Sequence, residues 1–255
     1  MSLLPITLLP VTRSLGLLVL SLFIAGCGSK PVVPAAHVTT LTVALANTHI
    51  VDTQGVRIMI DSGKHGDELK LLEEMAAAGI APESIDYLIL THGHTDHAGG
   101  AALFQRQFGT KVIASRAEKQ MLAAGKNGVL CPTTLLARFL QPSIERESYP
   151  PVVADIWVDD SFDLQALGIV GEVMAVPSHT AGSLAIIIGE NAFVGDLLRG
   201  ELLSKTQPAR HFYMCDLQTN DRDIQQILAY PNVRNWYTGH MGPVSAEAVR
   251  QSFQP

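Results

Sequence analysis

Four side chains that bind transition metals lie within the short segment Thr91-His92-Gly93-His94-Thr95-Asp96-His97. Imidazole and carboxylate groups are ligands that zinc accepts at about 2.0–2.2 Å. Alternation along an extended loop can direct His92 and His94 toward one ion while Asp96 and His97 face another. The segment therefore predicts part of a site for two neighbouring metal ions.

Three further candidate ligands follow apolar, β-branched runs that are typical of strands. His179 occurs in Pro-Ser-His-Thr-Ala-Gly, Asp196 in Val-Gly-Asp and His240 in Thr-Gly-His-Met-Gly. Together with the first segment they complete the ligand count that two ions require. Isolated histidines are interpreted as surface or hydrogen-bonded residues, and these are His37, His49 and His65.

This pattern resembles that of the metallo-β-lactamase superfamily, H-x-H-x-D-H followed by a His, a bridging Asp and a final His. The resemblance runs from about Leu41 to the C-terminus and implies an α/β (α+β) fold, an αββα sandwich of two mixed sheets flanked by helices. It assigns His92, His94 and His179 to the first ion, Asp96, His97 and His240 to the second, and Asp196 to both. Asp61, in Ile60-Asp61-Ser62-Gly63, matches a family aspartate that supports the site without binding metal.

Two such ions, expected to be zinc with iron or manganese as alternatives, lower the pKa of a shared water, so the predicted nucleophile is a bridging hydroxide. Asp96 is the candidate catalytic residue that orients this water and carries a proton to the leaving group. No Ser or Cys nucleophile is needed. The expected activity is metal-dependent hydrolysis of a small molecule.

The residue at position 196 narrows the substrate class. Zinc β-lactamases usually carry Cys or Ser there. With Asp196 at this position, the chain resembles glyoxalase II, lactonases and phosphodiesterases instead. The chain ends fifteen residues after His240, which argues against the helical substrate domain of glyoxalase II. Arg199 stands where homoserine-lactone hydrolases have Tyr. An ester, lactone or thioester is the expected substrate, with β-lactams and phosphodiesters as alternatives.

Basic and aromatic residues are concentrated between Arg199 and Tyr213 in an otherwise acidic chain of net charge −6. Arg199 or Arg210 is the candidate partner of a carboxylate or phosphate on the substrate. A solvated basic loop is an equally good interpretation. No Lys/Arg run is present, which disfavours nucleic acid as a partner.

The N-terminus predicts a secreted lipoprotein. The apolar stretch 15–25 is too short to span a bilayer but suits a signal peptide, and Ile24-Ala25-Gly26-Cys27 resembles the lipobox at which Cys27 is lipidated. An ordinary secretory signal is the alternative. The predicted organisation is a signal peptide (1–26), a tether (27–40) and a catalytic domain (41–255), anchored to the outer membrane and facing the periplasm.

Periodicity predicts a β-meander over residues 41–61 and a helix over 67–79 whose buried face carries Leu69, Leu72, Met75 and Ala76. The proline-containing stretch 125–161 is long for a connection and is interpreted as a lid, with an irregular insertion as the alternative. Cys131 and Cys215 are expected to be dispensable for metal binding, and the sequence leaves their pairing open.

Two hypotheses from other classes remain. Persulfide dioxygenases use a similar H-x-H-x-D-H segment to hold a single iron, so one bound iron with oxygen uptake would favour an oxidoreductase. A non-enzymatic metal-binding lipoprotein is the other hypothesis, and the complete ligand set argues against it. The oligomeric state is not determined by the sequence.

Overall fold

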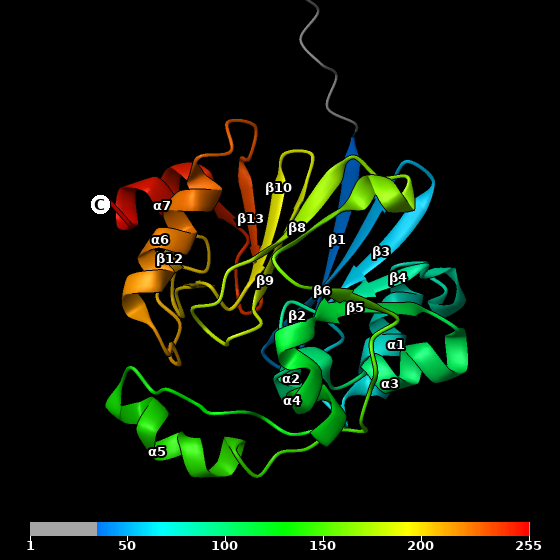
Figure 1. The fold of residues 1–255 in the computed structure, drawn as a ribbon, viewed down its shortest axis with the longest axis horizontal. Coiled ribbons are helices and arrows are strands. Elements are labelled where there is room, and N and C mark those ends of the chain that lie inside the picture. The colour runs from blue at the N-terminus through cyan, green and yellow to red at the C-terminus, as the bar shows by residue number, and fades with distance from the viewer. Residues whose placement is uncertain (1–34, 255) are drawn as a thin grey trace, which may run out of the picture. The chain divides into compact units, whose positions relative to one another are not determined.

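The computed structural model describes residues 35–254, which form two six-stranded sheets (Figure 1). The first sheet has the order β1 (Ala36–Val43), β2 (Ala46–Thr53), β3 (Val56–Ile60), β4 (Tyr87–Ile89), β5 (Lys111–Ser115), β6 (Ile156–Val158). The second has the order β14 (Val244–Ser245), β13 (Asn235–Thr238), β10 (Asn191–Gly195), β9 (Leu184–Ile188), β8 (Gly171–Ala175), β7 (Ser161–Asp163). A two-stranded ribbon pairs β11 (Arg199–Gly200) with β12 (Pro208–Ala209).

Both sheets are mixed. In the first sheet β1, β2 and β3 form an antiparallel meander, whereas β3 to β6 are parallel neighbours. The two-residue turn between β2 and β3 consists of Gln54 and Gly55, which both have positive φ angles. Such turns match the right-handed twist of the strands that they join.

Alternating side chains along the strands divide the interior into three apolar layers. Ile58 and Ile60 of β3 face the second sheet and pack with Ile186 and Phe193. Met59, between them in sequence, faces the opposite way and packs beneath the helices of the first sheet. Figure 1 shows the resulting order of helix, sheet, sheet and helix. The αββα architecture that the resemblance implies is thus confirmed.

Helices cover the outer faces of the two sheets. The first sheet is covered by α1 (Glu68–Ala77), α3 (Ala101–Leu103) and α4 (Lys119–Ala124), and the second by α6 (Leu217–Leu228) and α7 (Ala246–Ser252). The short α2 (Thr95–Ala98) lies within the metal-binding motif. None of the helices between residues 35 and 254 is long and apolar enough to cross a membrane.

The structure corrects one expected boundary and part of one expected helix face. Residues 36–40 were assigned to the tether, but they belong to β1, because their backbone pairs with β2 as far as Ala36 opposite Thr53. The expected face of α1 is confirmed at Met75 and at the partly buried Leu72, but Leu71 is also buried, whereas Leu69 and Ala76 are exposed. Packing against the sheet selects this face, and Leu69 lies on the other side of the helix. The signal peptide and Cys27 lie outside the described residues.

The stretch 125–161 contains regular structure that its sequence pattern did not indicate. It includes α5 (Leu135–Ile144), which is capped by Thr134, whose hydroxyl accepts a hydrogen bond from the Ala137 backbone N–H. Figure 1 shows α5 lying apart from both sheets, beyond their loops. A disulfide between Cys131 and Cys215 ties the start of this stretch to the loop before α6. The pairing that the sequence left open is therefore made.

Candidate metal centre and active site

Each candidate ligand follows the carboxyl end of a strand. In the first sheet β3 and β4 are parallel, and in the second β10 and β13 are parallel. β8 runs in the same direction as β10, because each is antiparallel to β9 between them. Ligand sites in α/β sheets commonly lie beyond such carboxyl ends. The loops at these ends carry Asp61, His92 to His97, His179, Asp196 and His240.

The first group of candidate ligands consists of three buried histidines. Nε2 of His92 and Nε2 of His179 lie 3.1 and 3.0 Å from Nδ1 of His94. Nitrogen atoms that bind one zinc ion at about 2.0–2.1 Å must lie within about 4 Å of one another. Both pairs that include His94 satisfy this condition, and all three ring nitrogens lie within 4.8 Å of one another, as in a tripod.

The second group consists of Asp96, His97 and His240. Nε2 of His240 lies 3.3 Å from Oδ2 of Asp96, and Nε2 of His97 lies 3.9 Å from Oδ1 of the same carboxylate. Gly239 makes this approach sterically feasible, since a Cβ atom there would collide with the His97 ring and the Asp196 carboxylate. The backbone beside His240 therefore contacts the centre directly.

Asp196 contacts both groups. Its Oδ2 atom is 3.5 Å from Nε2 of His179 in the first group and 3.4 Å from Nε2 of His97 in the second. Its Oδ1 atom is 3.5 Å from Nε2 of His240. The structure thus brings all seven predicted ligands together and gives Asp196 contacts on both sides.

In three of the candidate ligands, the ring nitrogen that faces away from the centre has an oxygen partner. Nδ1 of His97 donates to Asp61, Nδ1 of His179 to the Tyr213 carbonyl, and Nδ1 of His240 to the Leu45 carbonyl, at 2.8, 2.7 and 2.7 Å. Because a carbonyl or carboxylate oxygen accepts, these contacts place a proton on Nδ1 and turn Nε2 toward the centre. Such outer hydrogen bonds orient metal-binding histidines in proteins.

The electrostatics of the centre suit a divalent cation. Burial lowers the pKa of His94 to about 3 and that of His179 to about 4, so both imidazoles are neutral, as metal ligands must be. Burial also lowers the pKa of His240, but Asp196 and Asp96 outweigh it and raise this pKa to about 10. The carboxylates therefore attract positive charge strongly, and a divalent metal would supply it.

Two buried atoms support the same fit. Nε2 of His97 and Oδ1 of Asp196 have no hydrogen-bond partner among residues 35–254. Buried polar groups are normally satisfied, and unsatisfied ones often mark an ion site. The donor set, its convergence and these atoms all fit metal ions at this position.

His211 is a residue of this centre that sequence reasoning did not assign to it. Its Nε2 atom lies 3.3 Å from Oδ2 of Asp196, and its ring stacks on that of His240. Nδ1 of His211 lies against the Tyr213 backbone. The only sequence signal was its place among the basic and aromatic residues 199–213, which was interpreted as a substrate-binding segment.

Two carboxylates support the ligand loops from outside the centre. Asp61 accepts hydrogen bonds from Thr91 as well as from His97. Glu118, which the sequence did not single out, accepts from the Gly93 N–H at 3.0 Å and the Gly182 N–H at 2.9 Å. Glu118 therefore joins the loop of His92 and His94 to the loop that follows His179.

The two candidate substrate-binding arginines differ in their surroundings. Arg199 lines the cavity described below, and its guanidinium lies 3.9 Å above the Phe212 ring. Arg210 does not line this cavity, because it donates to Asn220 and pairs with Asp221 on α6 at 2.5 Å. The structure therefore places Arg199 near the centre and directs Arg210 away from it, which corrects the expectation for Arg210.

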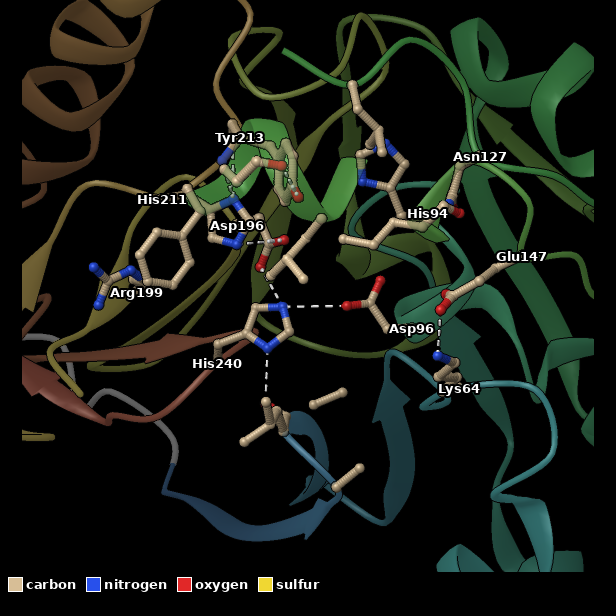
Figure 2. A pocket seen from close by; sticks show the side chains of 18 of the residues that line it. Lys64, His94, Asp96, Asn127, Glu147, Asp196, Arg199, His211, Tyr213 and His240 are labelled. Carbon is tan, nitrogen blue, oxygen red and sulfur yellow. Dashed lines mark hydrogen bonds and ion pairs between the residues drawn. The ribbon is translucent and has the colours of Figure 1, made fainter. Parts of the chain in front are cut away.

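A cavity of about 360 Å³ opens onto the candidate metal centre. His94, Asp96, Asp196, His211 and His240 line it. Segment 127–147, which includes α5, forms another part of its wall. Figure 2 shows Asn127 and Glu147 on one side of Asp96, with Arg199, His211 and Tyr213 on the other. The segment interpreted as a lid thus covers the site, and its movement stays a prediction.

Comparison with known proteins is consistent with this architecture. The sequence profile of the Metallo-beta-lactamase superfamily matches residues 41–246. The Rm3 metallo-beta-lactamase has a similar structure, with a TM-score of 0.61 and 18% identity over 84% of this chain and 87% of that one. At this identity the likeness shows the fold alone.

Two relatives were also found by sequence. A Beta-lactamase-like protein 2 homolog of Caenorhabditis elegans is 25% identical over 80% of this chain and 58% of that protein. A hydroxyacylglutathione hydrolase of Stenotrophomonas maltophilia (strain R551-3) is 30% identical over 64% of this chain and 50% of that protein. The chain spans 58% and 50% of the length of these two relatives. The profile match covers most of the chain, which therefore belongs to the metallo-beta-lactamase superfamily.

Proposed function

We propose that this protein is a hydrolase that uses two zinc ions held by the seven converging side chains. One observation carries the proposal: Asp196 contacts a three-histidine group on one side and the Asp96, His97 and His240 group on the other. Membership of a superfamily that includes a hydroxyacylglutathione hydrolase supports it.

Two ions bound there would make a water more acidic and polarise the oxygen of the scissile group. Both carboxylates line the cavity, but Asp96 is the residue placed to handle the proton, because its side chain is 35% exposed and that of Asp196 is 2% exposed. We assign Asp96 the role of orienting the attacking water and passing its proton to the leaving group. Because His92, His94 and His179 are buried, bulk water reaches the centre through the cavity.

The proposed substrates are esters, lactones and thioesters. In each case the oxygen of water forms a bond to the acyl carbon, and the bond from that carbon to oxygen or sulfur breaks. The leaving alkoxide or thiolate takes up the proton, and the acyl group is released as a carboxylate. Hydroxyacylglutathione belongs in the test panel because a relative carries that activity in its name.

Arg199 is proposed to bind an anionic group of the substrate. It lines the cavity and pairs with no carboxylate among residues 35–254, whereas Arg210 is paired with Asp221. Arg199→Gln should raise KM at least tenfold for an anionic ester and leave a matched neutral ester nearly unaffected. Arg210→Gln is the matched control and should change neither value. Equal effects of Arg199→Gln on both esters would remove this role.

The hydrolase proposal is tested on purified protein with defined metal content. Lactones, esters, thioesters, phosphodiesters and a chromogenic cephalosporin are assayed before and after chelation, and again after zinc is restored. Two zinc ions per chain and chelator-sensitive hydrolysis of an acyl substrate are expected. A single iron with oxygen uptake on a persulfide would overturn the proposal, as would a full zinc complement without hydrolysis of any substrate.

We also propose that the protein is anchored at the outer membrane by lipid on Cys27 and faces the periplasm. The lipobox-like Ile24-Ala25-Gly26-Cys27 supports this proposal, since lipid chains supply membrane affinity that a soluble domain lacks. Cys27→Ala should move the protein from the membrane fraction to the soluble fraction. A variant that stays in the membrane, together with wild-type protein that carries no lipid mass, would overturn it.

A further inference from the structure

The wall of the cavity is mostly apolar, whereas the candidate metal centre onto which it opens is polar. Apart from the candidate ligands, most of its lining comes from apolar side chains in three separate parts of the chain. These are the turn between β1 and β2, segment 130–144 and the loop after β11. Six of the apolar residues are Leu45, Leu130, Leu136, Leu140, Ile144 and Leu202.

Several of these leucines are exposed to solvent although they line the cavity. The exposed fractions of Leu136 and Leu140 are 60% and 43%, and that of Leu202 is 57%. Solvent-exposed apolar surface gathered around a cavity is typical of a binding site rather than of a monomer's ordinary surface. An apolar ligand that covered these side chains would gain free energy from their burial.

The polar groups in the same wall are already occupied by the protein. Asn127 accepts from the Thr95 N–H and donates to the Ile144 carbonyl. Glu147 pairs with Lys64 and accepts from the Thr95 hydroxyl. The Tyr213 hydroxyl donates to the Ala137 carbonyl. This wall therefore offers few free hydrogen-bonding groups to a sugar or a peptide, and it suits a hydrocarbon chain.

We infer that the cavity binds the acyl chain of a medium-chain ester, lactone or thioester, with the carbonyl carbon at the candidate metal centre and the chain along α5. The inference rests on the proposed hydrolase function and names its substrate class. Water adds to the carbonyl carbon, the bond to the leaving oxygen or sulfur breaks, and the chain remains in the cavity as a carboxylate until release.

Helix α5 provides its own matched control. Leu136 and Leu140, four residues apart, line the cavity. Leu135 and Phe139, which are also four residues apart, do not line it and are 85% and 80% exposed. Both pairs consist of large apolar residues. Each pair shares one side of the helix, because residues spaced by four are neighbours on its surface. Only their position relative to the cavity distinguishes them.

The test uses the full-length, zinc-loaded protein and p-nitrophenyl esters from acetate to decanoate, below their micelle-forming concentrations. Each buried methylene is expected to raise kcat/KM about three- to four-fold between butyrate and octanoate. The double variant Leu136→Gln/Leu140→Gln should reduce the ratio of octanoate to acetate activity at least tenfold. Leu135→Gln/Phe139→Gln should preserve this ratio. Equal reductions in both double variants would overturn the inference, because exposed apolar surface in general would then be responsible.

Binding of octanamide, measured by calorimetry, separates this inference from the proposed function, because it requires no ester turnover. Octanamide should bind the wild-type protein, and the Leu136→Gln/Leu140→Gln variant should bind it at least tenfold more weakly. Hydrolysis of p-nitrophenyl acetate without octanamide binding or chain-length dependence would overturn the acyl-chain site alone. Octanamide binding that depends on Leu136 and Leu140, without hydrolysis of any ester, would overturn the hydrolase and support the site.

Discussion

Oδ2 of Asp61 lies 2.8 Å from Nδ1 of His97, and the same carboxylate accepts two hydrogen bonds from Thr91. Asp61 therefore fixes the ring of a candidate ligand and the start of the His-rich loop together. Its own backbone has a φ of 59°, which Asp tolerates better than most residues.

Asp61→Asn should weaken binding of the second metal ion about 10- to 100-fold, because an amide cannot accept all three hydrogen bonds. Chelator competition measures the two dissociation constants. The control is Asp52→Asn, a carboxylate that pairs with Arg57 away from the centre. Unchanged metal affinity in folded Asp61→Asn protein would contradict the supporting role.

Removal of Asp196 should disturb both metal ions, whereas removal of His240 should affect mainly one. A carboxylate shared by two dications reduces their repulsion, and the His92, His94 and His179 tripod can hold an ion without His240. Asp196→Ala should lower activity by orders of magnitude and impair both sites. His240→Ala should retain about one ion per chain in metal analysis. Two retained ions and near-wild-type turnover in Asp196→Ala would exclude a bridging role.

Glu118→Gln should loosen the first metal site without unfolding the protein. The carboxylate is buried and accepts from the Gly93 and Gly182 N–H groups, so an amide there leaves one N–H facing another donor. Affinity for the first ion should fall about tenfold. The exposed change Glu83→Gln is the control. Metal affinity equal to that of the control would show that the connection between the loops is not needed.

The free energy of unfolding should depend on pH through Asp223 on α6. Burial raises its pKa from 3.8 to about 6, although a hydrogen bond from Ser178 partly opposes this. A raised native pKa stabilises the fold below about pH 4, and this stabilisation is lost as the pH rises through about 6.

At pH 8, Asp223→Asn should therefore be more stable than the wild type by about 1–2 kcal/mol, because it removes a buried charge. At pH 4 the difference should largely disappear. Urea unfolding of both proteins across this range measures it, with the exposed Asp160→Asn change as the control. A stability difference that does not vary with pH would argue against Asp223 as the titrating group.

Loss of the Cys131–Cys215 disulfide should affect stability but not metal binding. The bridge closes a loop with a sequence separation of 84, and every candidate metal ligand is a His or an Asp. Cys131→Ser/Cys215→Ser should lower the free energy of unfolding by about 2–4 kcal/mol. Metal content of the folded variant should match that of the wild type. Loss of metal from folded protein would mean that the disulfide also positions ligands.

The ligand set was predictable from the sequence because metals accept few residue types and because four candidates are contiguous. The remaining three could be found because each lies within a few residues of the end of a strand. The family resemblance that these residues carry implied the two sheets. In contrast, His211 and Glu118 carry no local signal, since their roles arise from contacts with residues distant in the chain.

Tertiary structure decided which of several plausible side chains serve the site. Arg199 and Arg210 are equivalent in sequence, but the Asp221 carboxylate pairs with Arg210 and leaves Arg199 beside the cavity. Helix α5 was not predicted from the sequence. Helical periodicity arises when one face of a helix packs on the core, but most large apolar side chains of α5 are exposed. Sequence alone thus determined which groups can bind metal. Only the packing of two sheets and α5 determined the cavity beside them, because a cavity is formed by segments that meet solely in the folded chain.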